Sequence, residues 1–148
     1  MSDGVITVRR FNATSDLCAV LDGWDAQSER WLGQRSSEPA PMACMDVGGT
    51  VVGWIDVDDS QPWLQPGEGN VGYCVFPVHR GNGYATRAVR LLRATLAGRR
   101  LRWALLVIDI ANDASLGVAR ASGAQLRPER IIPEFPRSVV YGIELSRD

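Results

Sequence analysis

The stretch that decides the fold is YCVFPVHRGNGYATRAVRLL, residues 73–92. It opens as an apolar run of strand length, which Pro77 must end or bulge, and it closes with apolar residues repeated at helical spacing. A turn with two glycines, residues 80–83, separates the two halves. The first amides of a helix lack backbone partners and the helix dipole is positive there, so this turn favours an anion.

The composition of the turn narrows the anion to a phosphate compound. Gly81 and Gly83 let the backbone approach phosphate oxygens closely, and Arg80 can add positive charge. The turn is not a complete GxGxxG, no acid follows about 20 residues later, and no Gly-Lys-Ser/Thr sequence is present to bind a nucleoside triphosphate with magnesium. A metal-free diphosphate remains, and coenzyme A is one.

Charge is distributed unevenly along the chain, although the formal net charge of its 148 residues is −1. Residues 1–68 contain 11 acids and 4 arginines, residues 69–108 contain 7 arginines and no acid, and residues 109–148 contain 6 acids and 5 arginines. We therefore expect one region that faces an anion and another that can attract a cation. All 16 basic residues are arginine, which excludes a lysine Schiff base and a phosphate-loop lysine.

Size and composition predict one soluble domain over residues 1–148. A hydrophobic content of 45% and a charged content of 22% are typical of globular proteins, and no apolar run approaches the roughly 20 residues of a membrane span. The beginning MSDGVITVRR lacks the pattern of a signal peptide, and three scattered cysteines favour a reducing cytoplasm. With one histidine, His79, expected at the surface, and no paired cysteine spacing, we expect no metal site.

The hydrophobic periodicity predicts a mixed α/β chain. Strands are expected at residues 4–11, 40–47, 50–59, 70–78, 101–110, 124–131 and 137–145. Helices are expected at residues 14–32, capped by Thr14 or Ser15, at 82–97, and at 112–123, capped by Asn112. The Gly48–Gly49 pair suits a hairpin turn. The apolar run at 101–110 is typical of a central strand that is covered on both faces.

Two segments resemble the GNAT superfamily of N-acetyltransferases. The first, residues 71–96, contains the acetyl-CoA signature R-x-x-G-x-G/A as RGNGYA, with a proline three residues before the arginine. The second, residues 105–124, contains NDASLGVARASGA, which is similar to the family's downstream N-x-x-S helix that ends in glycine. The sequence of the first segment is most similar to that of the ribosomal-protein N-terminal acetyltransferase branch of the superfamily. The resemblance implies a mostly antiparallel sheet of six to seven strands flanked by about four helices.

The same resemblance implies a set of residues that bind acetyl-CoA. Backbone groups of a short segment of the cofactor strand would pair with the pantetheine arm, the amides of the turn would hold the diphosphate, and Asn112 would bond the arm from the next helix. The expected residues are Tyr73, Cys74, Val75, Arg80, Gly81, Asn82, Gly83, Tyr84, Ala85, Thr86, Asn112 and Ser115.

The catalytic groups are less complete than the binding groups. Most such proteins have a tyrosine seven residues past the asparagine that protonates the leaving thiolate, but Ala119 stands there. Ser115, three residues past the asparagine, is the candidate acid of the branch that the chain resembles. Asp109, Asp56 and Glu68 could each relay a proton through water, and Asp109 is taken as the candidate base. The absence of an obvious base favours an acceptor amine of low pKa.

The leading hypothesis is thus an N-acetyltransferase that acts on a primary amine: a protein N-terminus, a small metabolite or an antibiotic. A non-catalytic acyl-CoA sensor or subunit is the alternative, because the tyrosine and the base are missing. Nucleic-acid binding by the arginine-rich helix is a third and weaker reading, since no aromatic platform accompanies the arginines and the sequence pI is about 5.8. Similar proteins often dimerise, so a homodimer is an open expectation.

Overall fold

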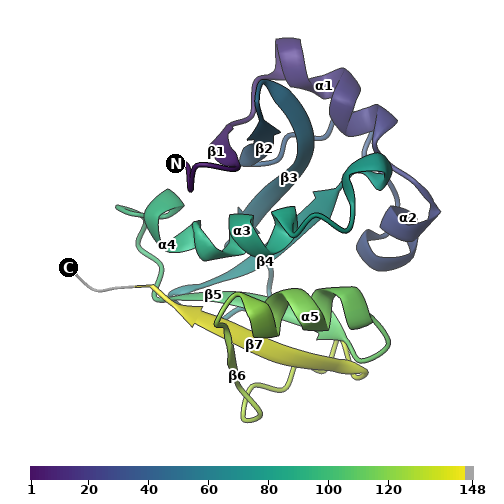
Figure 1. Ribbon diagram of the computed structural model, residues 1–148. Coiled ribbons are helices and arrows are strands. Elements are labelled where there is room, and N and C mark those ends of the chain that lie inside the picture. Colours follow the sequence, from purple (N-terminus) through teal and green to yellow (C-terminus); the bar gives the residue numbers. More distant parts are fainter. Residues whose placement is uncertain (146–148) are drawn as a thin grey trace.

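The computed structural model describes residues 1–145, and its centre is one seven-stranded sheet (Figure 1). The strands are β1 (Thr7–Arg10), β2 (Ala43–Val47), β3 (Thr50–Asp58), β4 (Glu68–Val75), β5 (Trp103–Asp109), β6 (Gln125–Leu126) and β7 (Ser138–Glu144). Their order is β1-β2-β3-β4-β5-β7-β6, and every neighbouring pair is antiparallel except β4 and β5. The prediction of a mixed, mostly antiparallel sheet is confirmed.

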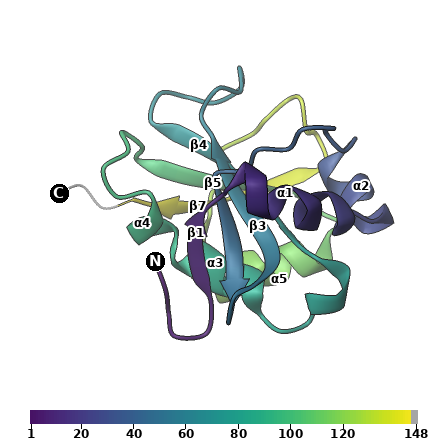
Figure 2. The same ribbon diagram turned by 90° about the horizontal axis from the view of Figure 1, so that it is seen from above.

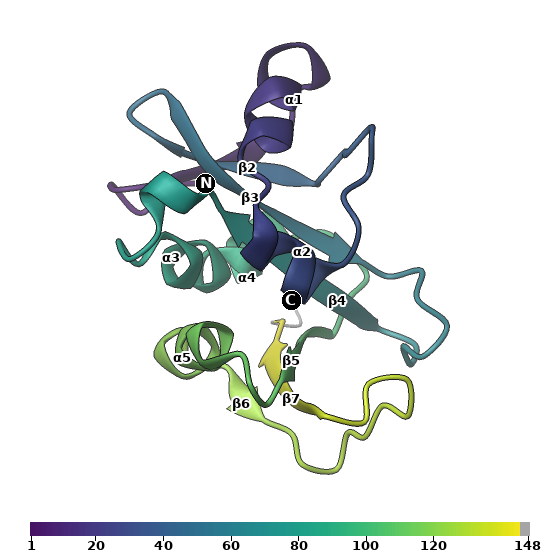
Figure 3. The same ribbon diagram turned by 90° about the vertical axis from the view of Figure 1, so that its right-hand side faces the viewer.

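Five α-helices accompany the sheet among residues 1–145, whereas the periodicity predicted three and the resemblance implied about four. They are α1 (Ala13–Asp22), α2 (Ala26–Leu32), α3 (Tyr84–Arg90), α4 (Leu92–Thr95) and α5 (Asp113–Ala121), and a 3-10 turn, η1 (Pro77–His79), precedes α3. Helices α3 and α5 lie on one side of the sheet, while the loops that join β3 to β4 and β6 to β7 lie on the other (Figure 3). The view from above shows α1 lying apart from α3 and α5 (Figure 2).

The predicted helix over residues 14–32 is wrong, because the chain forms two helices there. A side chain at Gly23 would overlap the ring of Phe76, and this close approach requires glycine. Asp25 then starts α2 with a capping box, in which its carboxylate accepts from the Ser28 amide (3.0 Å). The N-cap of α1 is Asn12, one position before the helix, rather than Thr14 or Ser15.

Other element boundaries also differ from the prediction, and for two elements the sequence gives the reason. The helix expected over 82–97 begins at Tyr84, because Gly83 adopts a left-handed conformation with φ of 76°, and it is interrupted at Leu91 before α4. The strand expected over 124–131 pairs only at β6. Pro128 has no N–H with which to extend this pairing.

The hydrophobic core divides by the faces of the sheet. The main cluster joins α3, α4 and α5 to the strands, and its members include Ala88, Leu92, Leu106 and Leu116. On the opposite face, a second cluster around Val20, Cys74 and Phe76 seats α1, and a third around Leu105, Ile132 and Val140 seats the two long loops. Burial of this apolar surface is the main force that holds these layers together.

Strands β4 and β5 pair only at their starts. The parallel register runs from Glu68 opposite Trp103 to Asn70 opposite Leu105, and no further pairing joins the two strands within the described chain. The strands therefore diverge toward their carboxyl ends, and the parallel pair opens into a cavity in the middle of the sheet.

Candidate active site

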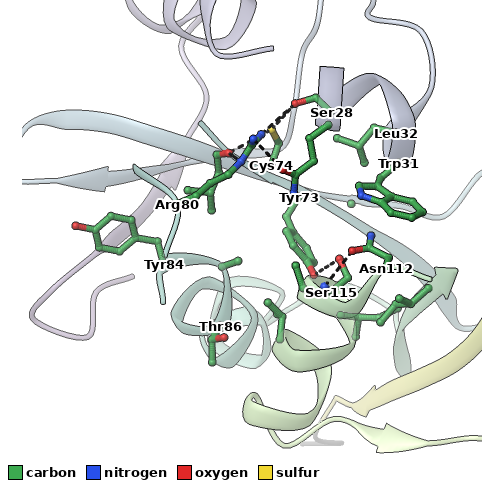
Figure 4. Close-up of a pocket in the computed structure, with 18 of the residues that line it drawn as sticks. Ser28, Trp31, Leu32, Tyr73, Cys74, Arg80, Tyr84, Thr86, Asn112 and Ser115 are labelled. Atoms are coloured by element: carbon green, nitrogen blue, oxygen red, sulfur yellow. Dashed lines mark hydrogen bonds between the residues drawn. The ribbon is translucent and has the colours of Figure 1, made fainter. Parts of the chain in front are cut away.

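The cavity has a volume of about 560 Å³ and lies between the diverging strands (Figure 4). Elements β4, β5, α2, α3 and α5 contribute to its wall. Of the residues predicted for the site, those that line it are Tyr73, Cys74, Val75, Arg80, Gly81, Gly83, Tyr84, Ala85, Thr86, Asp109, Asn112 and Ser115. Asn82 is not among the lining residues, because its side chain turns back to donate to the His79 carbonyl (2.9 Å).

The turn before α3 leaves a row of backbone N–H groups without partners. The amide of Arg87 is the first of α3 to reach a backbone acceptor, the Gly83 carbonyl at 3.1 Å. None of the six amides from Gly81 to Thr86 donates to an acceptor in the part of the chain that the structure describes. Both glycines of the turn have left-handed φ angles, 81° and 76°. A turn of this kind can act as a cradle for an anion, since its donors are unpaired and two of its positions carry no side chain.

Arg80 does not point over this cradle, contrary to the expectation that its charge adds to the anion site. Its guanidinium makes a bidentate ion pair with Asp25, at 2.6 and 2.9 Å, and its Nε donates to the Val75 carbonyl at 2.9 Å. The paired guanidinium holds the pKa of the Asp25 carboxyl well below its usual range. Arg80 therefore ties the turn to the start of α2.

The register of β4 determines which of its backbone groups face the cavity. Phe76 donates to the Val52 carbonyl of β3 at 2.8 Å, and hydrogen-bonded positions alternate along an antiparallel pair. The amides of Tyr73 and Val75 therefore point away from β3 toward the cavity, whereas the backbone of Cys74 turns toward β3. Two of the three predicted strand residues, rather than all three, thus offer backbone groups to a ligand.

The first turn of α5 carries a hydrogen-bonded set of side chains in the cavity wall. Asn112 caps the helix as predicted, and its Oδ1 accepts from the Ser115 amide at 3.2 Å. The Tyr73 hydroxyl of β4 donates to Ser115 Oγ at 2.9 Å (Figure 4). Burial raises the pKa of the Tyr73 phenol, which keeps it protonated. Ala119, one turn further along α5, is fully buried in the main core.

Among the three carboxylates considered as proton relays, only Asp109 lines the cavity. Its Oδ1 accepts from the Ala111 amide at 2.8 Å. Glu68 lies at the other end of β4 and is paired with Arg130 at 2.8 Å. Burial would raise the pKa of Glu68, but Arg130 and the Gln65 amide together outweigh that effect and the pKa is lowered. Asp56 accepts from the Met42 amide at 2.9 Å on β3.

The sequence analysis did not assign to the site the residues that α2 contributes. Its residues in the cavity wall are Gln27, Ser28, Trp31 and Leu32. Ser28 Oγ lies 3.5 Å from Cys74 Sγ, and burial raises the pKa of that thiol. The signal was present as Gly23 followed by Asp-x-x-Ser, a helix stop and a capping box, which the apparent helical period of the tryptophans concealed. His79 also lines the cavity.

No group of three or more His, Cys, Asp or Glu side chains within residues 1–145 is arranged to hold a metal ion. No helix within the same range has the length and apolar character needed to cross a membrane.

Comparison with known proteins identifies the family to which the chain belongs. The family described as acetyltransferase (GNAT) domain matches residues 7–125. The chain therefore belongs to the GNAT family of acetyltransferases. A comparison with curated protein sequences found no match.

Solved structures share the fold over nearly their whole length. An acetyltransferase from Agrobacterium tumefaciens superposes with a TM-score of 0.77 at 22% identity, covering 97% of this chain and 93% of that one. The aminoglycoside acetyltransferase AAC(6')-Ib, in complex with coenzyme A and kanamycin, gives 0.72 at 12% identity, covering 94% of both chains. RimL, a ribosomal L7/L12 alpha-N-protein acetyltransferase in complex with coenzyme A, gives 0.68 at 14% identity, covering 97% and 96%. At identities below 25%, the structural similarity shows a common fold alone.

Proposed function

We propose that this protein is an N-acetyltransferase that moves an acetyl group from acetyl-CoA to a primary amine by direct attack of the amine on the thioester. The observation that carries the proposal is the row of six unpaired amides from Gly81 to Thr86, a segment of which five residues line a cavity between diverging strands. Unpaired amides at the start of a helix suit the diphosphate of coenzyme A. The neighbours AAC(6')-Ib and RimL were solved with coenzyme A, which supports this choice of ligand.

The remaining groups can be given roles along the cavity. The amides of Tyr73 and Val75 would pair with the pantetheine arm, and the Val75 amide would also stabilise the oxyanion. Asn112 would bond the arm through its amide nitrogen, since its oxygen already caps α5. Alignment of the two reactants contributes about 7–11 kcal/mol in such reactions, more than a proton donor of 10²- to 10⁴-fold effect. Binding geometry is therefore the larger part of the catalysis.

Proton transfer falls to Ser115 and Asp109 in this proposal. Ser115 would give a proton to the departing thiolate, and Asp109 would receive the proton of the amine through water after the carbon–nitrogen bond has formed. Deprotonating a lysine at pH 7 costs about 4.6 kcal/mol, while an α-amino group costs about 1.1 kcal/mol. With Asp109 as the one acid in the cavity wall among the described residues, an amine of low pKa is the better acceptor.

The wall on the side of α2 also favours an acceptor with one amine beside an apolar group. Trp31 and Leu32 line this part of the cavity, and the Arg30 guanidinium stacks on the Trp31 ring at 4.4 Å. A polyamine antibiotic would need several carboxylates there. We therefore infer that a protein N-terminus or a small metabolite is acetylated, as in the ribosomal-protein branch, by a single domain over residues 1–148. A cytoplasmic homodimer remains an expectation.

A ligand comparison tests the binding half of the proposal. Acetyl-CoA or coenzyme A at a hundredfold excess over its dissociation constant stabilises the folded protein by about 2.7 kcal/mol, while ATP and NAD give no shift in melting temperature. Release of free thiol from acetyl-CoA, measured with a panel of α-amines, lysine-like amines and aminoglycosides, tests the transfer. Stabilisation by ATP or NAD to the same extent would refute the assignment.

A non-catalytic acyl-CoA sensor is the second candidate, favoured by the buried Ala119 at the usual position of the tyrosine acid. The variant Ser115→Ala separates the two functions. An enzyme that uses Ser115 should lose about tenfold or more in kcat with unchanged acetyl-CoA binding. A sensor should release no thiol before or after the substitution.

A further inference from the structure

The side chain of Tyr73 has a contact that binding through the backbone does not use. Its hydroxyl crosses from β4 to the first turn of α5 and donates to Ser115 Oγ at 2.9 Å (Figure 4). Both side chains belong to the cavity wall. The contact joins residues 42 positions apart in sequence, so the fold rather than local chain geometry brings them together.

The hydrogen bonds of Ser115 leave its own proton available. A serine hydroxyl has one hydrogen and two acceptor sites, and Tyr73 occupies one of these acceptor sites. Serines in helices commonly donate back to a carbonyl of the preceding turn, but the Ser115 hydroxyl donates to no acceptor in the described chain. Because Tyr73 is the donor in this contact, the Ser115 hydrogen points away from the phenol oxygen.

We propose that Tyr73 is a positioning residue that turns the Ser115 hydroxyl toward the sulfur of the thioester and replaces the proton that Ser115 gives up. This inference rests on the proposed acetyl transfer. It also accounts for Ala119, because the hydroxyl that α5 lacks at that position is supplied by β4. Tyr73 packs against the same core cluster that contains Ala119.

The proton inventory of the step balances. The amine nitrogen attacks the thioester carbon, the carbon–nitrogen bond forms, and the carbon–sulfur bond breaks with its electron pair left on sulfur. Ser115 passes its proton to sulfur as it receives the proton of Tyr73, so the serine oxygen is neutral before and after. The proton lost by the nitrogen passes through water to Asp109, which releases it to solvent, and solvent returns one proton to Tyr73. The products are the amide and the free thiol.

The relay avoids a serine alkoxide. An aliphatic hydroxyl resembles water, whose pKa is 15.7, while the departing thiol has a pKa of about 8.5. A phenol has an ordinary pKa near 10, and although burial raises this pKa at Tyr73, a phenol is still a stronger acid than an aliphatic hydroxyl. If Ser115 acted alone, its proton transfer to the thiolate would leave a serine alkoxide, which is a far stronger base than the thiolate. With Tyr73 supplying a proton to the serine oxygen, no alkoxide forms.

The test is a double-mutant cycle of Tyr73→Phe and Ser115→Ala in the full chain, with thiol release as the assay. Tyr73→Phe removes the hydroxyl and keeps the ring, so kcat should fall about tenfold while the dissociation constant of acetyl-CoA changes less than about twofold. The double variant should be no slower than Ser115→Ala, because Tyr73 acts through the serine. Tyr141→Phe, which removes a hydroxyl from β7 outside the cavity, is the matched control and should keep full kcat.

The outcomes separate the inference from the proposed function. Full kcat in Tyr73→Phe, or independent additive losses from the two substitutions, would overturn the role of Tyr73 while leaving acetyl transfer intact. A wild-type protein that binds coenzyme A but releases no thiol with any amine would overturn transfer and, with it, the relay. A rise in the acetyl-CoA dissociation constant without a change in kcat would show that the hydroxyl serves binding only, and it would also overturn the inference.

Discussion

The two ends of the cavity are built from different parts of the chain. At one end, the amides of residues 81–86 come from one continuous segment and need no side chain. At the other end, Tyr73, Asp109, Ser115 and Trp31 come from β4, β5, α5 and α2. The first end is set by local backbone conformation, while the second depends on strand register and helix phase across the whole fold.

This difference implies that the two ends should respond differently to substitution. Changing the backbone of the turn should abolish binding of the acyl donor, because several amides move together. Changing one side chain at the other end should alter the rate or the choice of acceptor and leave donor binding intact.

The largest effect is expected for the double variant Gly81→Val, Gly83→Val. Both glycines have φ angles near 80°, where a β-branched residue is strained, and nothing lies within 4 Å of an added Cβ at either position. The new side chains would occupy the space of the phosphates. Loss of two charge-assisted hydrogen bonds, each worth about 1.5–3 kcal/mol, should raise the acetyl-CoA dissociation constant by about 100-fold or more in titration calorimetry.

Gly98→Val is the matched control for this variant. Gly98 has a φ angle of 87° and equally open surroundings, but it lies outside the cavity. The control should lose stability through the same backbone strain and keep its affinity for acetyl-CoA. Equal losses of affinity in both variants would mean that strain, and not the amides of the turn, explains the effect.

The same contrast explains what could be predicted from the sequence. The glycine turn was found because positive φ and unpaired amides follow from two glycines between a strand and a helix. The link from Arg80 to Asp25 joins residues 55 positions apart and the link from Tyr73 to Ser115 joins residues 42 apart, so no local pattern encodes either. Gly23 is an intermediate case. A glycine that ends a helix can be recognised from the local sequence, but the contact with the Phe76 ring that makes glycine necessary joins distant parts of the chain.

A smaller effect is expected for Asp109→Asn. If the amine loses its proton only after attack, kcat/KM should level off near the pKa of the amine itself, about 7.8 for an α-amino group. The variant should then lower kcat/KM less than about tenfold and leave that inflection in place. Asp56→Asn, on β3 outside the cavity, should match the wild type. A wild-type inflection well below the amine pKa that moves upward in Asp109→Asn would instead identify a base that deprotonates the free amine.

The smallest effect is expected for Asp25→Asn, which breaks the one ion pair between the two ends of the cavity seen within residues 1–145. Asparagine is also a good N-cap, so the variant keeps the start of α2 and removes only the charge. The side chains of Arg80 and Asp25 are 26% and 32% exposed, so screening limits the loss to about 1 kcal/mol, or roughly 2–4 °C in melting temperature.

The pH dependence of that loss identifies its cause. Arg80 first, and the Ser28 amide second, hold the pKa of Asp25 well below its usual range. The stabilisation should therefore be complete above about pH 4, the pKa of the unfolded carboxyl, and should fade as the pH drops further. Melting curves of the wild type and Asp25→Asn should differ at pH 6, and the difference should shrink as the pH falls below 4 toward the lowered pKa of Asp25. The same variant also tests whether the Arg80 link positions α2 for the acceptor.

The matched control is Asp3→Asn, which breaks the similarly exposed ion pair between Asp3 and Arg87 far from α2. If the Arg80 link positions α2, only Asp25→Asn should raise the KM for the acceptor. An equal rise of KM in both variants would show that the two ends of the cavity act independently of this link.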